Sequence, residues 1–356
     1  MEIIINIAIL ILGFFFLVKG SDYFVDGAAK LASRIGIPEL IIGLTIVAMG
    51  TSAPEAAVSI TAAFKGSAEI TIGNIVGSNI FNILVILGIA CIMVPIAVEK
   101  TTVKYEIPYM VICTVLLILL GIDGEINIID GIILWAGFIL YLAYLFLNAT
   151  KNKKECSSQS VSDLWKQIIF IIGGIIAIVA GSKFAVYGAT ELARFLGISE
   201  RVIGLTIVAV GTSLPELFTS VTAARKGNAD IAIGNIVGSN IFNILFVIGT
   251  TALIVNVPFD AKFIIDGVIA VAAAIVLFLG VIRKRKLCRV SGIIMLICYA
   301  VYLLYLFLKY SLSFNMIVLY YRNYQNAVKG KDIWNTQQSH ITPTNVIVFQ
   351  QAKENF

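Results

Sequence analysis

Residues 42–88 begin IGLTIVAMGTSAPE and end GNIVGSNIFNILVILG, and residues 203–249 repeat them as IGLTIVAVGTSLPE to GNIVGSNIFNILFVIG. The copies lie 161 positions apart, and 34 of their 47 aligned residues are identical. Each copy places one acid, Glu55 or Glu216, within an otherwise apolar stretch. A soluble duplication has no need of such an acid, whereas a membrane transporter built from two halves around a central cation needs it twice.

The composition is that of a membrane protein. The chain is 59% hydrophobic and 13% charged, with a mean hydropathy of +0.96, whereas soluble proteins are about 25% charged. Apolar runs of roughly 20 residues recur, each long enough to cross the bilayer as a helix that satisfies its own backbone. We therefore predict an all-α membrane protein with ten transmembrane helices. The predicted spans are residues 3–30, 39–64, 70–97, 105–122, 126–148, 164–193, 201–224, 231–256, 261–282 and 288–309.

Basic residues predict the topology. The loops after odd-numbered spans hold 15 Lys and Arg residues and the intervening loops hold 4, so the positive-inside rule places both termini of this multi-pass cell-membrane protein outside the cell. Each copy has five spans, an odd number, so the second is inverted relative to the first, as in many secondary transporters. The predicted organisation is a five-helix repeat at 1–149, a cytoplasmic linker at 150–163, an inverted five-helix repeat at 164–309, and a polar and aromatic tail at 310–356.

Each copy also breaks a helix at a proline. Pro54 has no N–H to donate to the carbonyl of Gly50, and Pro215 stands in the same relation to Gly211. Backbone oxygens freed at membrane depth are tolerated only where they line a cavity or bind something. Together with a carboxylate and two hydroxyls they predict an oxygen cage on one helical face. Its members in the first copy are Ala48, Thr51, Ser52 and Glu55.

The next predicted span supplies a second wall of oxygens. Polar residues recur there at every fourth position, and neighbouring glycine pairs allow close helix packing. Taken singly, such residues often only join helices, but their duplication around two buried acids favours a binding role. The two stripes are Asn74, Ser78 and Asn82, and Asn235, Ser239 and Asn243.

The chemistry of this cage favours a hard cation. Each ionised carboxylate at the bilayer centre costs about 2.5–3.5 kcal/mol on insertion scales and so indicates function. Two carboxylates balance one divalent ion, and Ca²⁺ takes about 6–8 oxygen ligands in flexible geometry. The cysteines are scattered and the single His340 lies in the tail, so zinc and copper are not expected. The net charge of +5 comes from scattered loop residues, so nucleic acid is not an expected partner. Surface snorkelling or ordinary ion pairs explain the acids near helix ends at least as well as transport does; these acids are Asp22, Asp26 and Glu191.

The paired G-T-S-x-P-E and G-N-x-x-G-S-N motifs resemble the alpha repeats of the Na⁺/Ca²⁺ exchanger family, prokaryotic type, in the cation/Ca²⁺ exchanger superfamily. The resemblance covers residues 1–309. It implies exchange of cytosolic Ca²⁺ for external Na⁺ at a shared midplane site, by alternating access, with no cofactor besides the transported ions. By motif position it implies Glu55 and Glu216 as central ligands, Thr51 and Thr212 as further Ca²⁺ ligands, Ser52, Ser213, Ser78, Ser239 and the carbonyls of Ala48 and Ala209 at the Na⁺ sites, and Asn82 and Asn243 flanking the middle.

One position departs from the family pattern, and two rival functions remain. Well-known members, including the K⁺-dependent branch, carry an aspartate where this chain has Asn243, which argues against K⁺ co-transport. A Ca²⁺/H⁺ antiporter is the main alternative, because two buried glutamates can carry two protons. A passive Ca²⁺ channel is weaker, because two inverted halves with proline-broken helices favour alternating access. An enzyme is not expected, because no His lies within the spans to activate a nucleophile or bind a metal.

Spans 1 and 6 are the predicted moving part. They align as repeat partners and are about 28–30 residues long, so they must tilt in the bilayer. Both carry spaced glycines, Gly13 with Gly20 and Gly174 with Gly181. We expect these glycines to give the two helices a smooth face against the core of spans 2–3 and 7–8.

Overall fold

The computed structural model describes residues 2–151, 161–196, 209–306 and 308. Residues 1–300 form one compact unit, which contains both copies of the motif. Of the second unit, residues 301–356, the described part is the end of a helix. Most of the predicted linker at 150–163, the start of the predicted span at 201–224 and the tail with His340 lie outside the described residues.

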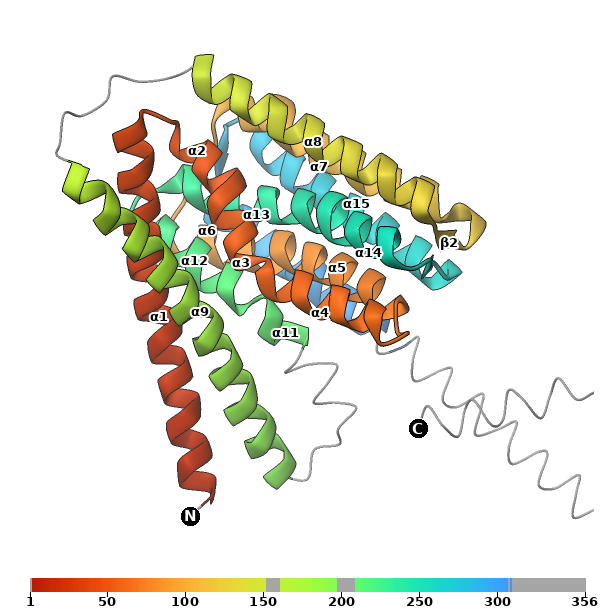
Figure 1. Cartoon of the computed structure of the whole chain (residues 1–356), viewed down its shortest axis with the longest axis horizontal. Helices are drawn as coiled ribbons and strands as arrows, with labels where there is room; N and C mark the ends of the chain where they lie inside the picture. The colour runs from red at the N-terminus through yellow and green to blue at the C-terminus, as the bar shows by residue number, and fades with distance from the viewer. Residues whose placement is uncertain (1, 152–160, 197–208, 307, 309–356) are drawn as a thin grey trace, which may run out of the picture. The chain divides into compact units, whose positions relative to one another are not determined.

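The described chain is almost entirely helical (Figure 1). The first half contains α1 (Glu2–Ile35), α2 (Glu39–Ile42), η1 (Gly43–Val47), α3 (Ala48–Thr51), α4 (Ala53–Phe64), α5 (Glu69–Phe81), η2 (Asn82–Ile86), α6 (Leu87–Met93), β1 (Ile96–Ala97), η3 (Thr102–Glu106), α7 (Ile107–Leu120), η4 (Gly121–Asp123), β2 (Glu125–Ile126) and α8 (Ile128–Lys151). The second half contains α9 (Val161–Phe195), α11 (Ala209–Thr212), α12 (Leu214–Arg225), α13 (Ala229–Phe242), η6 (Asn243–Ile248), α14 (Gly249–Ile254), β3 (Val257–Pro258), α15 (Ala261–Ile282), β4 (Lys286–Leu287) and a last helix, Arg289–Leu306.

Within the described residues, eight helices are long and apolar enough to cross a membrane. The bent pair Glu39–Thr51 and Ala53–Phe64 makes a ninth candidate. Large apolar side chains such as Ile11, Leu140 and Phe146 are exposed on these helices, which suits contact with lipid chains. The chain is therefore a mostly helical, multi-pass membrane protein, as the composition predicts.

The core is formed by the helices that carry the G-N-x-x-G-S-N motifs. In α13 every residue from Ile231 to Phe242 is buried. Its glycines allow this, because a Cβ added at Gly238 would lie 2.7 Å from the carbonyl oxygen of Leu44 in η1, and one at Gly234 would lie 3.0 Å from that of Leu40. The second motif of the second half thus packs directly against α2 and η1, which precede the G-T-S-A-P-E motif of the first half.

The helix break predicted at Pro54 is confirmed. Helix α3 ends at Thr51, α4 begins at Ala53, and the two are bent by 47°. Ser52 lies at the bend with φ −83° and ψ 6°. In the second copy Ser213 has nearly the same conformation, with φ −90° and ψ 4°, directly before α12. Proline in the first turn of each following helix accounts for both breaks, because it has no N–H to continue the hydrogen bonding of the preceding turn.

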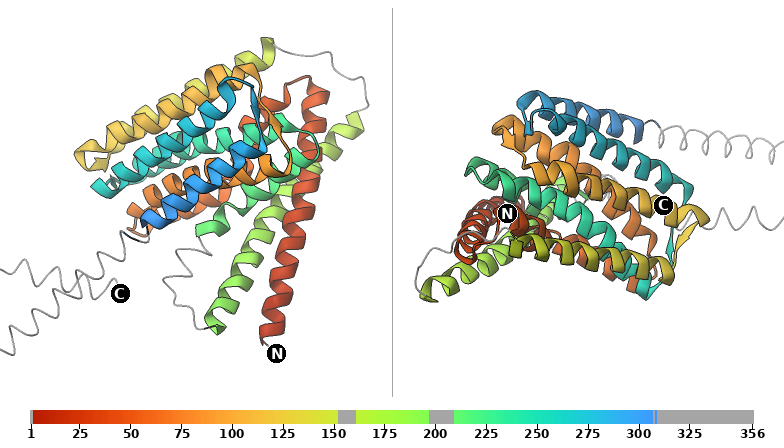
Figure 2. Two further views of the ribbon diagram at one scale, coloured as in Figure 1. Left: turned by 180° about the vertical axis from the view of Figure 1, so that it is seen from behind. Right: turned by 90° about the horizontal axis from the view of Figure 1, so that it is seen from above.

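The glycines of α1 and α9 serve a different contact from the one predicted. The two helices lie side by side (Figures 1 and 2). A Cβ added at Gly13 would lie 2.8 Å from the carbonyl oxygen of Gly181, and one at Gly20 would lie 3.0 Å from that of Gly174. These glycines therefore join α1 to α9, backbone against backbone, and do not face the core. The prediction was wrong because spaced glycines indicate a close approach without indicating the partner.

Two short antiparallel pairs of strands connect the halves. β1 pairs with β4, with Ile96 opposite Leu287, and β2 pairs with β3, with Ile126 opposite Val257. Val257 lies 161 positions after Ile96, and Ile126 lies 161 positions before Leu287. The two strand pairs are therefore related by the repeat, and these contacts between the halves are symmetric.

Candidate ion-binding site

The two motif glutamates lie together at the centre of the core. Glu55 is in the first turn of α4 and Glu216 in the first turn of α12, where the positive end of each helix dipole favours a carboxylate. Both are at most 1% exposed. The Ser52 hydroxyl donates to Glu216 Oε1 over 2.7 Å, and the Ser213 hydroxyl donates to Glu55 Oε1 over 3.3 Å. Each carboxylate is thus held by the serine at the helix break of the other half.

Four buried oxygens around this pair have no hydrogen-bond donor in the described structure. They are the second carboxylate oxygens of Glu55 and Glu216 and the amide oxygens of Asn82 and Asn243. Buried polar atoms are almost always paired, because leaving one unpaired costs about 1–3 kcal/mol. When both glutamates are ionised, all four are acceptors, and a cation is a partner of the kind that such oxygens take.

Four asparagines orient the two amide oxygens. The side chains of Asn79 and Asn240 each donate to the other's backbone carbonyl, both over 3.1 Å. Asn82 donates to the Asn240 side-chain oxygen over 3.0 Å, and Asn243 donates to that of Asn79 over 3.1 Å. Because the amide nitrogens of Asn82 and Asn243 are committed to these bonds, their oxygens are left for another partner.

Sequence reasoning missed Asn79 and Asn240. A stripe at every fourth position selects Asn74, Ser78 and Asn82, and Asn79 lies one residue off that stripe. The available signal was the identical G-S-N triplet in both copies, which includes each of these asparagines.

The other predicted ligands occupy several positions around the pair. The Ser213 hydroxyl lies 3.4 Å from that of Ser78, and the Ser239 hydroxyl lies 3.4 Å from the Ala48 carbonyl oxygen. Thr51 donates to the Asn235 side-chain oxygen over 3.0 Å. The remaining two predicted ligands, Ala209 and Thr212, are in α11, immediately before Ser213.

The stripe residues Asn74 and Asn235 brace the helices. Asn74 donates to the Ser59 hydroxyl over 3.1 Å, and Asn235 donates to that of Ser220 over 2.8 Å. Both amide nitrogens are thus used within their own half of the chain.

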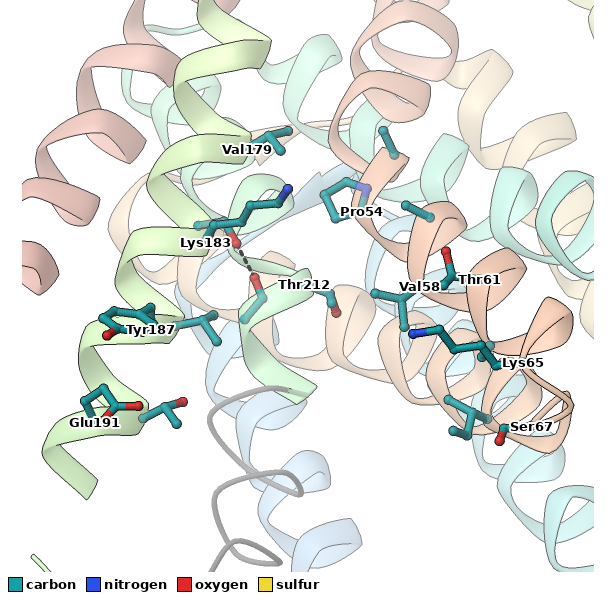
Figure 3. A pocket seen from close by; sticks show the side chains of 18 of the residues that line it. Pro54, Val58, Thr61, Lys65, Ser67, Val179, Lys183, Tyr187, Glu191 and Thr212 are labelled. Carbon is teal, nitrogen blue, oxygen red and sulfur yellow. Dashed lines mark hydrogen bonds between the residues drawn. The ribbon is translucent and has the colours of Figure 1, made fainter. Parts of the chain in front are cut away.

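A cavity of about 1010 Å³ lies beside the two helix breaks, between α4 and α9. Its lining includes Pro54, Thr212 and Lys183 next to the helix breaks, and Lys65 and Tyr187 farther away (Figure 3). Glu55 and Glu216 themselves are not among the residues that line it.

The symmetry-related contact, between α1 and α12, is closed by ion pairs. Lys226 lies 2.8 Å from Asp26 and 3.2 Å from Asp22. Glu191 likewise pairs with Arg194. These three acids therefore form ordinary ion pairs, which is one of the two explanations that the sequence offers for them.

The sequence model of the family described as "Sodium/calcium exchanger protein" matches residues 5–147 and 166–308. The chain belongs to the sodium/calcium exchanger family. Among relatives of this exchanger-family chain, the inner membrane protein YrbG of Escherichia coli is 39% identical, over 69% of this chain and 79% of that one. The sodium/calcium exchanger MaX1 of Methanosarcina acetivorans is 33% identical, over 86% and 99% of the two chains.

A solved structure shares the fold. The sodium-calcium exchanger NCX_Mj superposes on this exchanger-family chain with a TM-score of 0.75 at 33% identity, covering 84% of this chain and 98% of the other. The family resemblance given by the motifs is thus confirmed, and exchange of Na⁺ and Ca²⁺ is the activity of the family.

Proposed function

We propose that this protein is a secondary active antiporter that exchanges Na⁺ for Ca²⁺ by alternating access, and not an enzyme. The observation that carries the proposal is the reciprocal pairing of Glu55 and Glu216 with the serines of the opposite half. One oxygen of each carboxylate is held by Ser213 or Ser52, and the other has no donor among the described residues. When both carboxylates are ionised, this buried centre accepts hydrogen bonds and carries two negative charges, which suits a divalent cation.

The same centre suits Na⁺ when Ca²⁺ is absent. The hydroxyls of Ser52 and Ser213 contact the carboxylates. The Ser78 hydroxyl lies near Ser213, and the Ser239 hydroxyl lies near the Ala48 carbonyl. Hard oxygen ligands of this kind accept either ion. In this proposal Thr51, Thr212, Ala209, Asn82 and Asn243 complete the ligand set. Ca²⁺ and Na⁺ then compete for one site, so the two are carried in turn and never together.

The proposed architecture is ten transmembrane helices in two inverted repeats, with both termini outside the cell. Two observations support it. The contacts between the halves map onto one another by a shift of 161 positions, and the loops richest in Lys and Arg alternate along the chain. Single cysteines introduced at Glu99 and Glu125, on opposite sides in this topology, test it by labelling with a membrane-impermeant thiol reagent in sealed vesicles. Labelling of both from one side would contradict it.

The decisive experiment is ⁴⁵Ca²⁺ uptake into proteoliposomes under an imposed Na⁺ gradient, compared with an imposed pH gradient. Na⁺-driven accumulation above equilibrium is the expected result. Accumulation driven by the pH gradient alone would instead identify a Ca²⁺/H⁺ antiporter. Flux that follows only the Ca²⁺ gradient would identify a passive channel.

A further inference from the structure

A second cavity, of about 410 Å³, lies between η3–α7 and α8, apart from the paired glutamates. We call it the α7–α8 cavity. The residues of its lining that matter here are Lys104, Tyr105, Glu106, Tyr109, Tyr141 and Tyr144.

This cavity contains a buried carboxylate that the transport site does not use. Glu106 is 3% exposed, and its Oε1 accepts a hydrogen bond of 2.7 Å from the Tyr144 hydroxyl. Among the described residues its Oε2 has no hydrogen-bond partner, and neither does the buried hydroxyl of Tyr141. In the described part of the chain no Lys or Arg forms an ion pair with Glu106. An unpaired buried carboxylate oxygen in an apolar setting calls for a cationic or hydrogen-donating ligand.

Aromatic rings line the approach to this carboxylate. Tyr109 and Tyr141 are stacked, with centroids 5.5 Å apart and planes at 8°, and the rings of Tyr105 and Tyr144 lie 6.3 Å apart. Ring faces attract cations, including organic ammonium groups. The combination of ring faces and a carboxylate favours an amine over a bare metal ion, which would need several oxygen ligands.

The cavity borders on surfaces suited to lipid. Ile112 and Leu140, which also line it, are 59% and 69% exposed on helices that can span the membrane. Lys104 is exposed as well, and its amine lies 4.9 Å from the centroid of the Tyr105 ring. A buried acid, an exposed base and an apolar surface thus occur together, which matches an amphiphile whose headgroup carries both an ammonium and a phosphate.

The second half of the chain keeps only part of this arrangement. Tyr141 and Tyr144 are matched 161 positions later by Tyr302 and Tyr305, whereas Lys104 is matched by Ile265, and Glu106 is matched by Gly267, which follows Asp266. The transport acids, in contrast, are duplicated. The combination of an acid with the exposed base Lys104 is therefore found in the first half alone, unlike the duplicated transport acids.

We propose that the α7–α8 cavity binds the headgroup of phosphatidylethanolamine. The ammonium donates to Glu106 Oε2 and rests against the tyrosine rings, the phosphate pairs with Lys104, and an acyl chain lies over Ile112 and Leu140. Phosphatidylcholine has no N–H groups from which Glu106 Oε2 could accept a hydrogen bond. Phosphatidylglycerol brings no cation to the acid.

Native mass spectrometry of the full chain in detergent tests this proposal with three lipids of identical acyl chains. Wild type is expected to retain phosphatidylethanolamine at least roughly tenfold more tightly than either of the others. Glu106→Gln should lose that preference, because a neutral amide cannot pair with the ammonium. Glu99→Gln, an exposed acid in the preceding loop, is the matched control and should keep it.

Two further outcomes guard the test against misfolding and against the wrong lipid. Lys104→Met, at an exposed position, should weaken phosphatidylethanolamine binding without disturbing the core. Equal retention of all three lipids by wild type, or unchanged preference in Glu106→Gln, would overturn the proposal. So would a preference for phosphatidylglycerol that depends on Lys104 and not on Glu106.

Discussion

Asn79 and Asn240 hold each other's main chain: each side-chain amide donates to the other's backbone carbonyl over 3.1 Å, across the boundary between the two halves. The same two side chains accept from Asn243 and Asn82 through their amide oxygens. These four hydrogen bonds, which we call the Asn79–Asn240 clasp, therefore join the halves and also orient two oxygens of the candidate ion site.

Replacing Asn79 by Ala should lower both stability and Ca²⁺ affinity. The change leaves the Asn240 carbonyl and the Asn243 amide without their partners, at about 1–3 kcal/mol for each buried group. The thermal midpoint in detergent and the KM for Ca²⁺ measure the two effects. Asn74→Ala is the control, because Asn74 bonds to Ser59 within its own half. Equal effects of the two substitutions would show that the clasp has no special role at the site.

Glu55→Gln and Glu216→Gln should each abolish Ca²⁺ transport. A neutral amide leaves the divalent charge half compensated, and losing one partner of a buried charge pair costs about 3–5 kcal/mol, or more than roughly 100-fold in affinity. Na⁺-driven ⁴⁵Ca²⁺ uptake is the measurement, with Glu191→Gln as a control acid that is paired with Arg194 near a helix end. Near-normal exchange by either variant would remove these glutamates from the centre of the mechanism.

Transport should not require K⁺. The position that carries an aspartate in the K⁺-dependent branch is Asn243 here, and its amide nitrogen donates to Asn79. We expect Ca²⁺ flux at constant Na⁺ and clamped membrane potential to be the same with and without K⁺. A clear dependence on K⁺ would show that other oxygens build a K⁺ site.

Lys226→Met should loosen the contact between α1 and α12. Its ion pairs with Asp22 and Asp26 are partly exposed, and such pairs contribute about 0.2–1 kcal/mol each. Thr222 reports on this contact, because its hydroxyl donates to Ser21 on α1. In a background without native cysteines, Thr222→Cys should react with an aqueous thiol reagent roughly threefold faster when Lys226 is replaced by Met than when Lys226 is kept.

The repeat partner of Lys226 provides the control. Lys65 lines the cavity beside α9, where the positions equivalent to Asp22 and Asp26 are Lys183 and Tyr187. Lys65→Met should leave labelling at Thr222→Cys unchanged. If both substitutions accelerated it alike, the ion pairs would not be what closes this contact.

Helices α1 and α9 should move together over the core. Bridging cysteines at Ser21 and Thr222 with a short bifunctional thiol reagent ties α1 to α12 and should stop exchange while Ca²⁺ binding remains measurable. The rings of Tyr23 on α1 and Phe170 on α9 lie 5.4 Å apart. Bridging cysteines at these two positions with the same reagent ties α1 to α9 and should leave exchange intact. Exchange at the unbridged rate in the first pair would place the moving part elsewhere.

The sequence predicts the local features of the site well. Proline chemistry alone locates the helix break before Pro54, and helical spacing places Thr51, Ser52 and Glu55 on one face. What it does not predict is pairing over long distances in the chain. Nothing in the spacing assigns Ser52 to Glu216 or Asn79 to Asn240. The spaced glycines of α1 indicate close packing with another helix, but they do not identify α9 as that helix. Those assignments depend on how the halves dock.

The two pairs of strands have a consequence for how the protein is made. β1 and β2 leave the ribosome long before β4 and β3, which supply their backbone partners. The first half therefore enters the membrane with unpaired strand edges at two of its loops, and it completes them only when the last helices arrive. By the same reasoning, two polypeptides divided within residues 150–163 would each carry strands complementary to the other's, which is a means for separately synthesised halves to find one another.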